Sequence, residues 1–275
     1  MSLGRPAITR RAAGAAVASG RPEAIVRVHG LTKRYGSAAP ALVDVSFSID
    51  PGEFVAVLGP SGAGKTTLFR CLTGLTRPDA GSVSVRDQDI YRIGGRAQRA
   101  ARHEIALIFQ QFNLVRRLTA HRNVLAGRLA TVSTWRVLVG RFAKSDRQRA
   151  LACLDAVGLL DRAYARADEL SGGQQQRVAI ARALAQEATV ILADEPVASL
   201  DPESASVVLE MLHAVARTGV AVVASLHQVH LATSYADRII ALRAGRVVED
   251  APADRVDAQA LEQIYARDTP VGSPA

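Results

Sequence analysis

The chain has 275 residues, 48% of them hydrophobic and 22% charged, with a formal net charge of +8. This length and composition favour one large globular domain, or one domain with a sizeable insert, that can bury a core. No run of about eighteen apolar residues occurs, which excludes a helix that crosses a bilayer. The two cysteines, Cys71 and Cys153, form neither a metal-site spacing nor a disulfide framework, so we expect a reducing compartment.

The excess of positive charge lies mainly in the first 22 residues and between Arg92 and Arg149. Neither segment interleaves its arginines with aromatic residues, as a surface for single-stranded nucleic acid does. We therefore interpret both as solvated basic faces and expect no nucleic-acid partner. Residues 1–24 are rich in Ala, Gly and Arg, and the apolar stretch after Arg11 is too short and weak for an export signal. They predict a disordered N-terminal extension.

The first part of the chain alternates short strands with a helix. Residues 25–28 predict a strand, and residues 43–49 alternate apolar and polar side chains, as a strand with one buried face does. A continuous apolar run over 54–58 predicts a buried parallel strand, and a helix follows from Lys65 to about residue 75. Further strands are predicted around Val83 and over 105–109.

From about residue 116 to 168, apolar residues recur at helical spacing, which predicts a helical subdomain with a loop around Gly140 and residues 144–146. Strands return at 190–193 and 220–226, and residues 239–249 predict a hairpin that turns at Gly245. Residues 257–265 predict a last helix, and residues 266–275 a flexible tail. Together these elements predict an α/β domain over residues 25–265, with a mostly parallel core sheet and an antiparallel side sheet from the early strands.

A glycine-rich segment directly after the run at 54–58 fits the phosphate-loop pattern G-x-x-x-x-G-K-[ST]. Successive backbone N–H groups of such a loop face a phosphate, and the following helix N-terminus adds partial positive charge. Lys65 is expected to reach the β- and γ-phosphates of ATP, and the Thr66 hydroxyl to ligate Mg²⁺. We expect the nucleotide to be bound by Gly59, Pro60, Ser61, Gly62, Ala63, Gly64, Lys65, Thr66 and Thr67.

Two later strands end in polar residues. The run at 190–193 ends at Asp194 and Glu195, which places two carboxylates at the carboxyl edge of the sheet, beside the phosphate loop. We expect Asp194 to hold Mg²⁺, directly or through water, and Glu195 to act as general base on the attacking water. Without the phosphate loop, the two carboxylates would fit an acidic helix cap equally well. His227 follows the strand at 220–226 and is expected to hydrogen-bond the γ-phosphate.

The segment Leu170-Ser171-Gly172-Gly173-Gln174 resembles the LSGGQ signature of the ATP-binding cassette ATPases, and residues 175–184 resemble its usual continuation. Gln110 is similar to the family's Q-loop glutamine, Ser199-Leu200-Asp201 to its D-loop and His227 to its switch histidine. Tyr35 is similar to the aromatic residue that stacks on adenine. The resemblance covers residues 24–265 and implies a P-loop NTPase fold.

This resemblance implies that two copies meet head to tail with two ATP molecules between them. Each ATP then lies on the phosphate loop of one copy and under Ser171 and Gly173 of the other, and Asp201 contacts the opposite copy. Gln110 is implied to reach Mg²⁺ and the attacking water, and to respond to a membrane partner. The helix after Ser171 supplies donors that a phosphate loop alone lacks. ATP therefore joins the dimer, and hydrolysis releases it.

A narrower resemblance is to the ATPases of phosphonate importers. Residues 108–115, 123–129 and 192–202 carry it, and the pairs Val197-Ala198 and His227-Gln228 are its most telling details. It implies uptake of phosphonates or similar oxyanions through integral-membrane permease subunits at the cytoplasmic face of the inner membrane. A periplasmic phosphonate-binding protein is implied as an indirect partner. The alternatives are an importer of another cargo, such as polar amino acids, and a soluble cassette ATPase of DNA repair or translation.

Overall fold

The computed structural model describes residues 23–37, 39–132, 135 and 140–257. The predicted N-terminal extension, up to residue 22, lies outside the described residues. The same holds for the predicted last helix beyond Asp257 and for the predicted tail.

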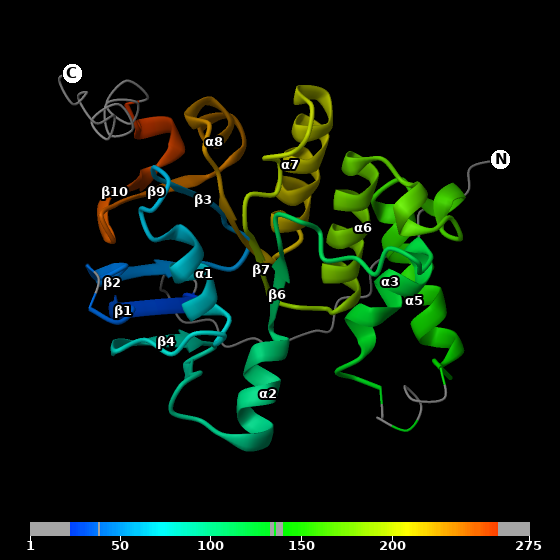
Figure 1. Ribbon diagram of the computed structural model, residues 1–275, viewed down its shortest axis with the longest axis horizontal. Helices are drawn as coiled ribbons and strands as arrows, with labels where there is room; N and C mark the ends of the chain where they lie inside the picture. Colours follow the sequence, from blue (N-terminus) through cyan, green and yellow to red (C-terminus); the bar gives the residue numbers. More distant parts are fainter. Residues whose placement is uncertain (1–22, 38, 133–134, 136–139, 258–275) are drawn as a thin grey trace.

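The central layer is a six-stranded sheet in the order β10-β9-β3-β8-β7-β6 (Figure 1). Its four neighbouring pairs from β9 to β6 are parallel, and β10 pairs with β9 as an antiparallel hairpin. The strands are β3 (Phe54–Leu58), β6 (Ile105–Ile108), β7 (Val190–Ala193), β8 (Ala221–Ser225), β9 (Arg238–Arg243) and β10 (Arg246–Pro252).

A second sheet of four antiparallel strands, in the order β2-β1-β4-β5, lies beside the first. Its strands are β1 (Val26–Lys33), β2 (Leu42–Ile49), β4 (Ala80–Val85) and β5 (Gln88–Asp89). The prediction of a mostly parallel core sheet with an antiparallel side sheet is confirmed.

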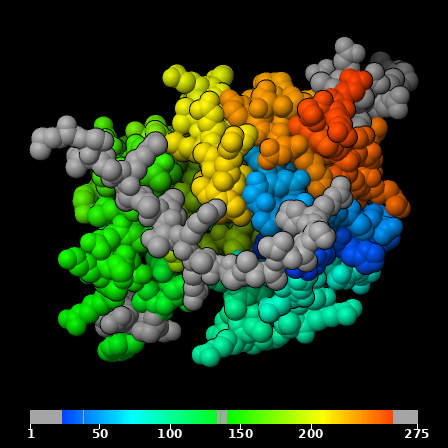
Figure 2. Space-filling model, turned by 180° about the vertical axis from the view of Figure 1, so that it is seen from behind, coloured from blue at the N-terminus to red at the C-terminus, as the bar shows by residue number. Residues whose placement is uncertain are grey.

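Seven described helices surround the sheets. In Figure 1, α3 and α5 pack on α6, on the side away from the six-stranded sheet, and Figure 2 shows α7 at the surface between this helical part and the C-terminal elements. The helices are α1 (Lys65–Leu72), α2 (Gly95–His103), α3 (Ala120–Leu125), α5 (Lys144–Ala156), α6 (Gly172–Ala185), α7 (Pro202–Ala216) and α8 (Val229–Tyr235). Short 3₁₀ turns lie at Ala126–Arg128, Leu160–Arg162, Ala167–Glu169 and Ala253–Arg255.

The core has two parts, one on each face of the six-stranded sheet. Successive side chains of a strand point to opposite faces, so Phe54, Ala56 and Leu58 of β3 join one part and Val55 and Val57 join the other. The first part includes the apolar faces of α5, α6 and α7, and the second includes α1 and the four-stranded sheet. All five residues of β3 are fully buried, as its unbroken apolar run predicts.

One local expectation is wrong. Residues 144–146 do not form a loop, because α5 begins at Lys144 with Ala143 as its N-cap. Their polarity has two other causes: Lys144 and Ser145 lie on the exposed first turn, and Asp146 pairs with Arg128, with 3.2 Å between Oδ1 and Nε. An acidic residue in the first turn of a helix also interacts favourably with the positive end of the helix dipole.

No helix in the described ranges is both long and apolar enough to cross a membrane. Cys71 and Cys153 are both buried free thiols, and burial raises the pKa of each to about 11. Cys71 therefore acts as a small core residue on α1.

Candidate functional site

Four neighbouring parallel strands deliver the predicted residues to one edge of the central sheet. The phosphate loop follows β3, His227 follows β8, Asp194 and Glu195 follow β7, and Gln110 follows β6. In an open parallel sheet, ligands bind at the carboxyl ends of the strands. The fold thus places these residues where such a sheet forms its ligand site.

The conformation of the phosphate loop needs glycine at Gly59 and Gly64. Their φ angles are 151° and 107°, in the region that favours glycine. A Cβ atom on Gly59 would lie 2.3 Å from the carbonyl oxygen of Leu242, and one on Gly64 would lie 2.4 Å from that of Ala41. The phosphate loop therefore packs closely between the end of β9 and the residue that precedes β2.

Lys65, the first residue of α1, turns back over this loop. Its Nζ atom donates to the carbonyl oxygens of Gly59 at 2.6 Å and Pro60 at 3.1 Å, and the residue is only 6% exposed. Burial lowers its pKa, and the nearby charges of Glu195 and Asp194 partly oppose that shift. The ammonium group is thus held close to the loop, where a bound phosphate would compensate its desolvation.

Ser225, the last residue of β8, connects the two carboxylate residues at the end of β7. Its hydroxyl donates to Oδ1 of Asp194 at 2.8 Å and accepts from the backbone N–H of Glu195 at 2.7 Å. Ser225 is fully buried. Burial raises the pKa of Asp194, while the bond from Ser225 lowers it. One hydroxyl group therefore holds both the carboxylate of Asp194 and the backbone of Glu195 in position.

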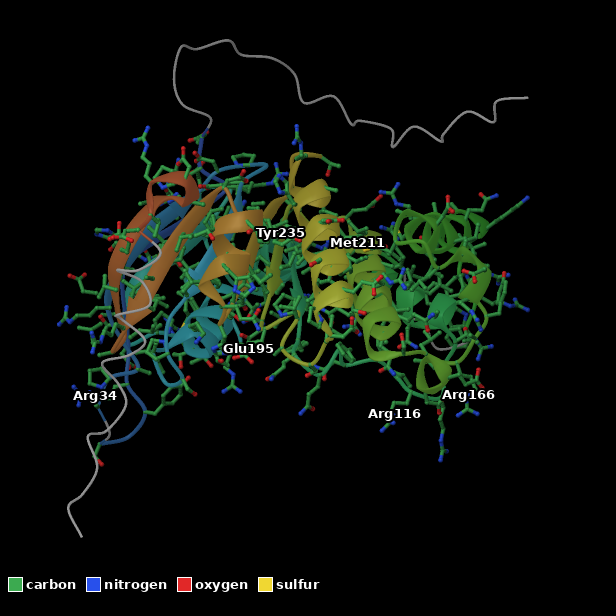
Figure 3. The ribbon with its side chains drawn as sticks, turned by 90° about the horizontal axis from the view of Figure 1, so that it is seen from above. Arg34, Arg116, Arg166, Glu195, Met211 and Tyr235 are labelled. Carbon is green, nitrogen blue, oxygen red and sulfur yellow. The ribbon has the colours of Figure 1, made fainter. Side chains whose placement is uncertain are left out.

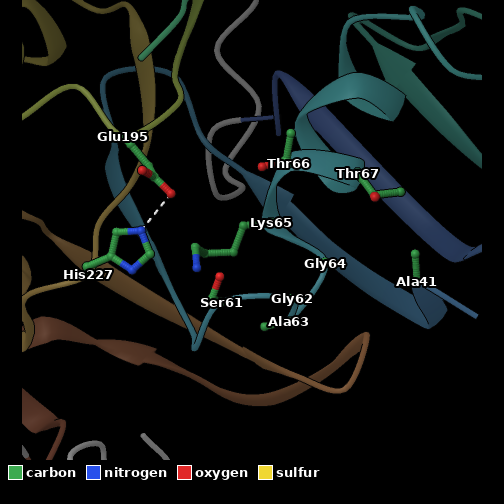
Figure 4. A pocket seen from close by; sticks show the side chains of 10 residues that line it. All are labelled: Ala41, Ser61, Gly62, Ala63, Gly64, Lys65, Thr66, Thr67, Glu195 and His227. Atoms are coloured by element: carbon green, nitrogen blue, oxygen red, sulfur yellow. Dashed lines mark hydrogen bonds and ion pairs between the residues drawn. The ribbon is translucent and has the colours of Figure 1, made fainter. Parts of the chain in front are cut away.

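Glu195 has a left-handed backbone, with a φ of 51°, which is unusual for a residue other than glycine. Its side chain lies beside His227 at the hollow, and 2.6 Å separates Oε1 from Nε2 of the histidine (Figure 4). An ionised carboxylate accepts hydrogen bonds only, so Nε2 is the donor.

Ten residues line the hollow at the phosphate loop. Two of them, Glu195 and His227, come from β7 and β8, which the sequence separates from the loop by more than a hundred residues. The structure thus brings the predicted base and the predicted histidine to the predicted phosphate loop. The lining residues are Ala41, Ser61, Gly62, Ala63, Gly64, Lys65, Thr66, Thr67, Glu195 and His227.

An adjoining hollow holds the other predicted ligands. Thr66 lines both hollows, and in the second it lies with Gln110 and Asp194. A hydroxyl, an amide oxygen and a half-buried carboxylate are the oxygen donors that Mg²⁺ prefers. In the described residues no group of three or more His, Cys, Asp or Glu could hold a metal ion. Mg²⁺ that bridges to phosphates needs only one or two protein ligands, so this donor set fits it.

Ser171 and its neighbours lie elsewhere. Ser171 caps α6 through a capping box, in which its Oγ accepts from the N–H of Gln174 and its own N–H donates to Oε1 of Gln174. A Cβ atom on Gly173 would lie 2.9 Å from Oγ of Ser204, while Gly172 is exposed. Ser171, Gly173 and Gln174 line a separate hollow with Arg177 and residues of α7. Within one chain, this hollow shares no residue with that of the phosphate loop.

Two further predicted residues lie outside the phosphate-loop hollow. Asp201 is exposed and caps α7, because its Oδ1 accepts from the N–H of Ser204 at 2.9 Å, and this bond lowers the pKa of its carboxyl. Tyr35 follows β1 and is 44% exposed, with Nζ of Lys33 5.6 Å from its ring centre. An exposed aromatic face of this kind is available for stacking.

The basic side chain that lines the phosphate-loop hollow is Lys65. Seen from above, Glu195 lies toward the same side of the molecule as Arg34, Arg116 and Arg166 (Figure 3). None of these three arginines lines the hollow, and Arg166 is paired with Asp168.

Comparison with known proteins assigns the family. The sequence profile described as "ABC transporter" matches residues 42–198, more than half of the chain. The chain belongs to the ABC transporter family. It is therefore an ATPase, and its fold is that of the ATP-binding cassettes.

This cassette is 46% identical to a phosphonates import ATP-binding protein of Rhodopseudomonas palustris, over 89% of this chain and 88% of the relative. It is 48% identical to one of Thiobacillus denitrificans, over 88% of this chain and 93% of the relative. Identity to one of Lactococcus lactis subsp. cremoris is 42%, over 89% of this chain and all of the relative.

Solved structures resemble the cassette over most of its length. A dimeric ATP-binding cassette in a post-hydrolysis state, bound to ADP and Pi, matches with a TM-score of 0.70 and 34% identity, over 83% of this chain and 98% of that one. CbiO1 of Clostridium perfringens, part of the ABC transporter complex cbiONQ, matches with a TM-score of 0.75 and 27% identity, over 87% and 92%. Related cassettes thus bind nucleotide, form dimers and act in transporter complexes.

Proposed function

We propose that this cassette is the ATP-hydrolysing subunit of an importer for phosphonates, with residues 25–265 as one nucleotide-binding domain. The observation that carries the cargo class is the identity of 42–48% to several phosphonates import ATP-binding proteins, along nearly the whole described chain. The site residues support the hydrolysis step, while the cargo itself never touches this subunit.

ATP is the substrate in this proposal, and its phosphates lie in the hollow of the phosphate loop. The backbone N–H groups of residues 61–67 and the ammonium group of Lys65 hold the β- and γ-phosphates. Thr66, Asp194 and Gln110 hold Mg²⁺, which when bound neutralises charge on the phosphates. Tyr35 stacks on the adenine ring.

Glu195 and His227 carry the chemistry. Glu195 faces the hollow from the end of β7 and takes a proton from the attacking water as general base. His227 lines the same hollow and donates through Nε2, which contacts Glu195 in this structure and donates to the γ-phosphate when ATP is bound. Ser225 keeps both carboxylate residues in place while this happens.

A second copy completes the site. Ser171 and Gly172 are exposed at the N-terminus of α6, and Ser171 lines a hollow that shares no residue with the hollow of the phosphate loop in the same chain. A head-to-tail dimer brings this helix N-terminus onto the γ-phosphate bound by the partner, where its N–H groups and dipole stabilise negative charge. Asp201, exposed at the start of α7, then faces the opposite copy.

The membrane partner is a permease that contacts the neighbourhood of Gln110. Leu75, beside Gln110 in one hollow, is 64% exposed, and Val115 is 56% exposed. In this proposal both exposed apolar side chains contribute to the contact with the permease. The cassette therefore works at the cytoplasmic face of the membrane through its permease, and a periplasmic phosphonate-binding protein acts on that permease.

Growth tests this function. A strain that lacks the gene is grown with methylphosphonate, or with orthophosphate, as the sole source of phosphorus. We expect the wild-type gene, but not Glu195→Gln, to restore growth on the phosphonate, and all strains to grow on orthophosphate. Equal growth of the deletion strain on methylphosphonate would overturn the cargo assignment. A defect in the uptake of a polar amino acid instead would support the alternative cargo.

A further inference from the structure

One arginine connects the helix of Ser171 to the loop of Gln110. Arg182 lies on α6, about three turns after Ser171. Its Nη1 atom donates to the carbonyl oxygen of Asn113 at 2.6 Å, and its Nη2 atom donates to that of Phe112 at 2.9 Å. Both carbonyls belong to the loop that follows Gln110, about seventy positions earlier in the sequence.

The loop backbone needs this support. Phe112 and Asn113 both have left-handed backbones, with φ of 59° and 47°. Asparagine tolerates this region, but for phenylalanine it is sterically unfavourable. The loop makes two bonds of its own, from the N–H of Phe112 to the carbonyl of Phe109 and from the N–H of Asn113 to that of Gln111. The planar guanidinium group then fixes two successive carbonyls at once, which a single ammonium group does not do.

No ion pair accounts for the positive charge of Arg182 in the described residues. In the described part of the chain no carboxylate pairs with it, and burial lowers its pKa. Arg182 is half-buried, so its charge loses part of its hydration without gaining a counter-ion, and an apolar side chain is often as stable in such a place. Arg128, by contrast, donates to Asp146, Glu187 and the carbonyl of Ala185 within the helical part.

We propose that Arg182 is a positioning residue for ATP hydrolysis: by gripping the carbonyls of Phe112 and Asn113, it ties the position of Gln110 to that of α6. This inference rests on the proposed role of Gln110 at the metal and the attacking water. A helix moves as a rigid rod, so a shift of its Ser171 end carries Arg182 and the loop along. Contact of Ser171 with the partner's nucleotide is thereby passed to Gln110 in the same copy.

The first test needs no activity. Hydrogen exchange at the amides of Phe112 and Asn113 is measured in the nucleotide-free protein, for wild type, Arg182→Met and the matched control Arg128→Met. We expect Arg182→Met to speed exchange at these two amides about tenfold or more, since bonds to a charged donor are lost, while Arg128→Met leaves them at the wild-type rate. Wild-type exchange in Arg182→Met would overturn the proposal.

The second test is a double-mutant cycle on kcat with Gln110→Ala. If Arg182 acts through Gln110, Arg182→Met lowers kcat about tenfold with little change in KM for ATP, and the double variant is no slower than the slower single variant. The effects of Arg128→Met and Gln110→Ala should multiply instead. Multiplying effects of Arg182→Met and Gln110→Ala would show that Arg182 only stabilises the fold, and would overturn the proposal.

The role of Arg182 can be tested separately from the proposed role of Gln110 in hydrolysis. Full activity of Gln110→Ala would refute the role of Gln110, while the exchange experiment still decides whether Arg182 holds the loop. Should Arg182→Met fail to fold, Arg182→Lys takes its place in both experiments. Lysine keeps the charge but not the two-pronged donor, so we expect faster exchange and a lower kcat from it as well.

Discussion

His227 Nε2 lies 2.6 Å from Oε1 of Glu195, and the two residues stand at the ends of the neighbouring strands β8 and β7. Glu195 has a left-handed backbone, and its N–H group donates a hydrogen bond to the hydroxyl of Ser225. The proposed general base and the proposed phosphate donor therefore form one hydrogen-bonded pair beside the phosphate loop.

His227→Ala should lower kcat by about a hundredfold while the KM for ATP changes little, because the histidine acts on charge that develops in the transition state. Steady-state ATPase kinetics measure both constants. His227→Gln keeps a hydrogen-bond donor and should retain more activity than the alanine variant. An equal loss of ATP binding and turnover would contradict this role.

Lys65→Ala should weaken ATP binding by about ten- to a hundredfold, because it removes a charge-assisted contact to the β- and γ-phosphates. Titration calorimetry on the purified cassette measures the affinity. Lys144→Ala, which removes an exposed lysine from the first turn of α5, is the control and should bind ATP normally. Normal affinity in Lys65→Ala would refute the phosphate-loop assignment.

Ser225→Ala should lower kcat about tenfold, because Asp194 and the N–H of Glu195 both lose a partner. The hydroxyl normally lowers the pKa of Asp194, so its removal raises that pKa further. Asp194 then takes up a proton at higher pH, and the acidic limb of the pH–rate profile moves to higher pH. Ser206→Ala, which removes a hydroxyl bonded to the carbonyl of Pro202 on α7, should leave the profile unchanged. A wild-type profile in Ser225→Ala would count against this positioning role.

Ser171→Arg should abolish most turnover yet leave ATP binding by a single copy near normal, since Ser171 and the phosphate loop share no hollow within one chain. Ser145→Arg, at the exposed first turn of α5, is the matched control and should be fully active.

A mixture of two inactive variants tests directly whether two copies share one ATP site. A mixed dimer of Ser171→Arg and Lys65→Ala copies holds one intact site, built from the phosphate loop of the first copy and Ser171 of the second. We expect ATPase activity to appear when the two inactive proteins are combined. An inactive mixture would speak for a site built within one chain.

The chemistry-bearing motifs could be predicted because their signals are local. Five apolar residues before a G-x-x-x-x-G-K-T segment predict β3 and the loop that follows it. Asp194-Glu195 at the end of another apolar run predict two carboxylates at the same edge of the sheet, and Glu195 lines the phosphate-loop hollow while Asp194 lines the adjoining one. The antiparallel side sheet followed from the alternation in residues 43–49.

The supporting residues could not be predicted, because their partners are distant in sequence. Ser225 is one polar residue in an apolar strand, and it contacts residues thirty positions away. In the sequence, nothing distinguishes Arg182 from other helical arginines. Its contacts with the carbonyls of Phe112 and Asn113 are visible only in the folded chain. The polar residues at 144–146 wrongly predict a loop for a related reason, because Arg128, the ion-pair partner of Asp146, lies outside the local pattern.

The central claim is that the γ-phosphate joins two copies and that its hydrolysis separates them. Glu195→Gln keeps the size of the side chain but removes the general base, so ATP should bind and remain unhydrolysed. Sedimentation velocity of this variant with Mg²⁺ and ATP, and again with ADP, measures the mass directly. The account predicts a dimer with ATP and a monomer with ADP. A Glu195→Gln protein that binds ATP and stays monomeric would contradict it.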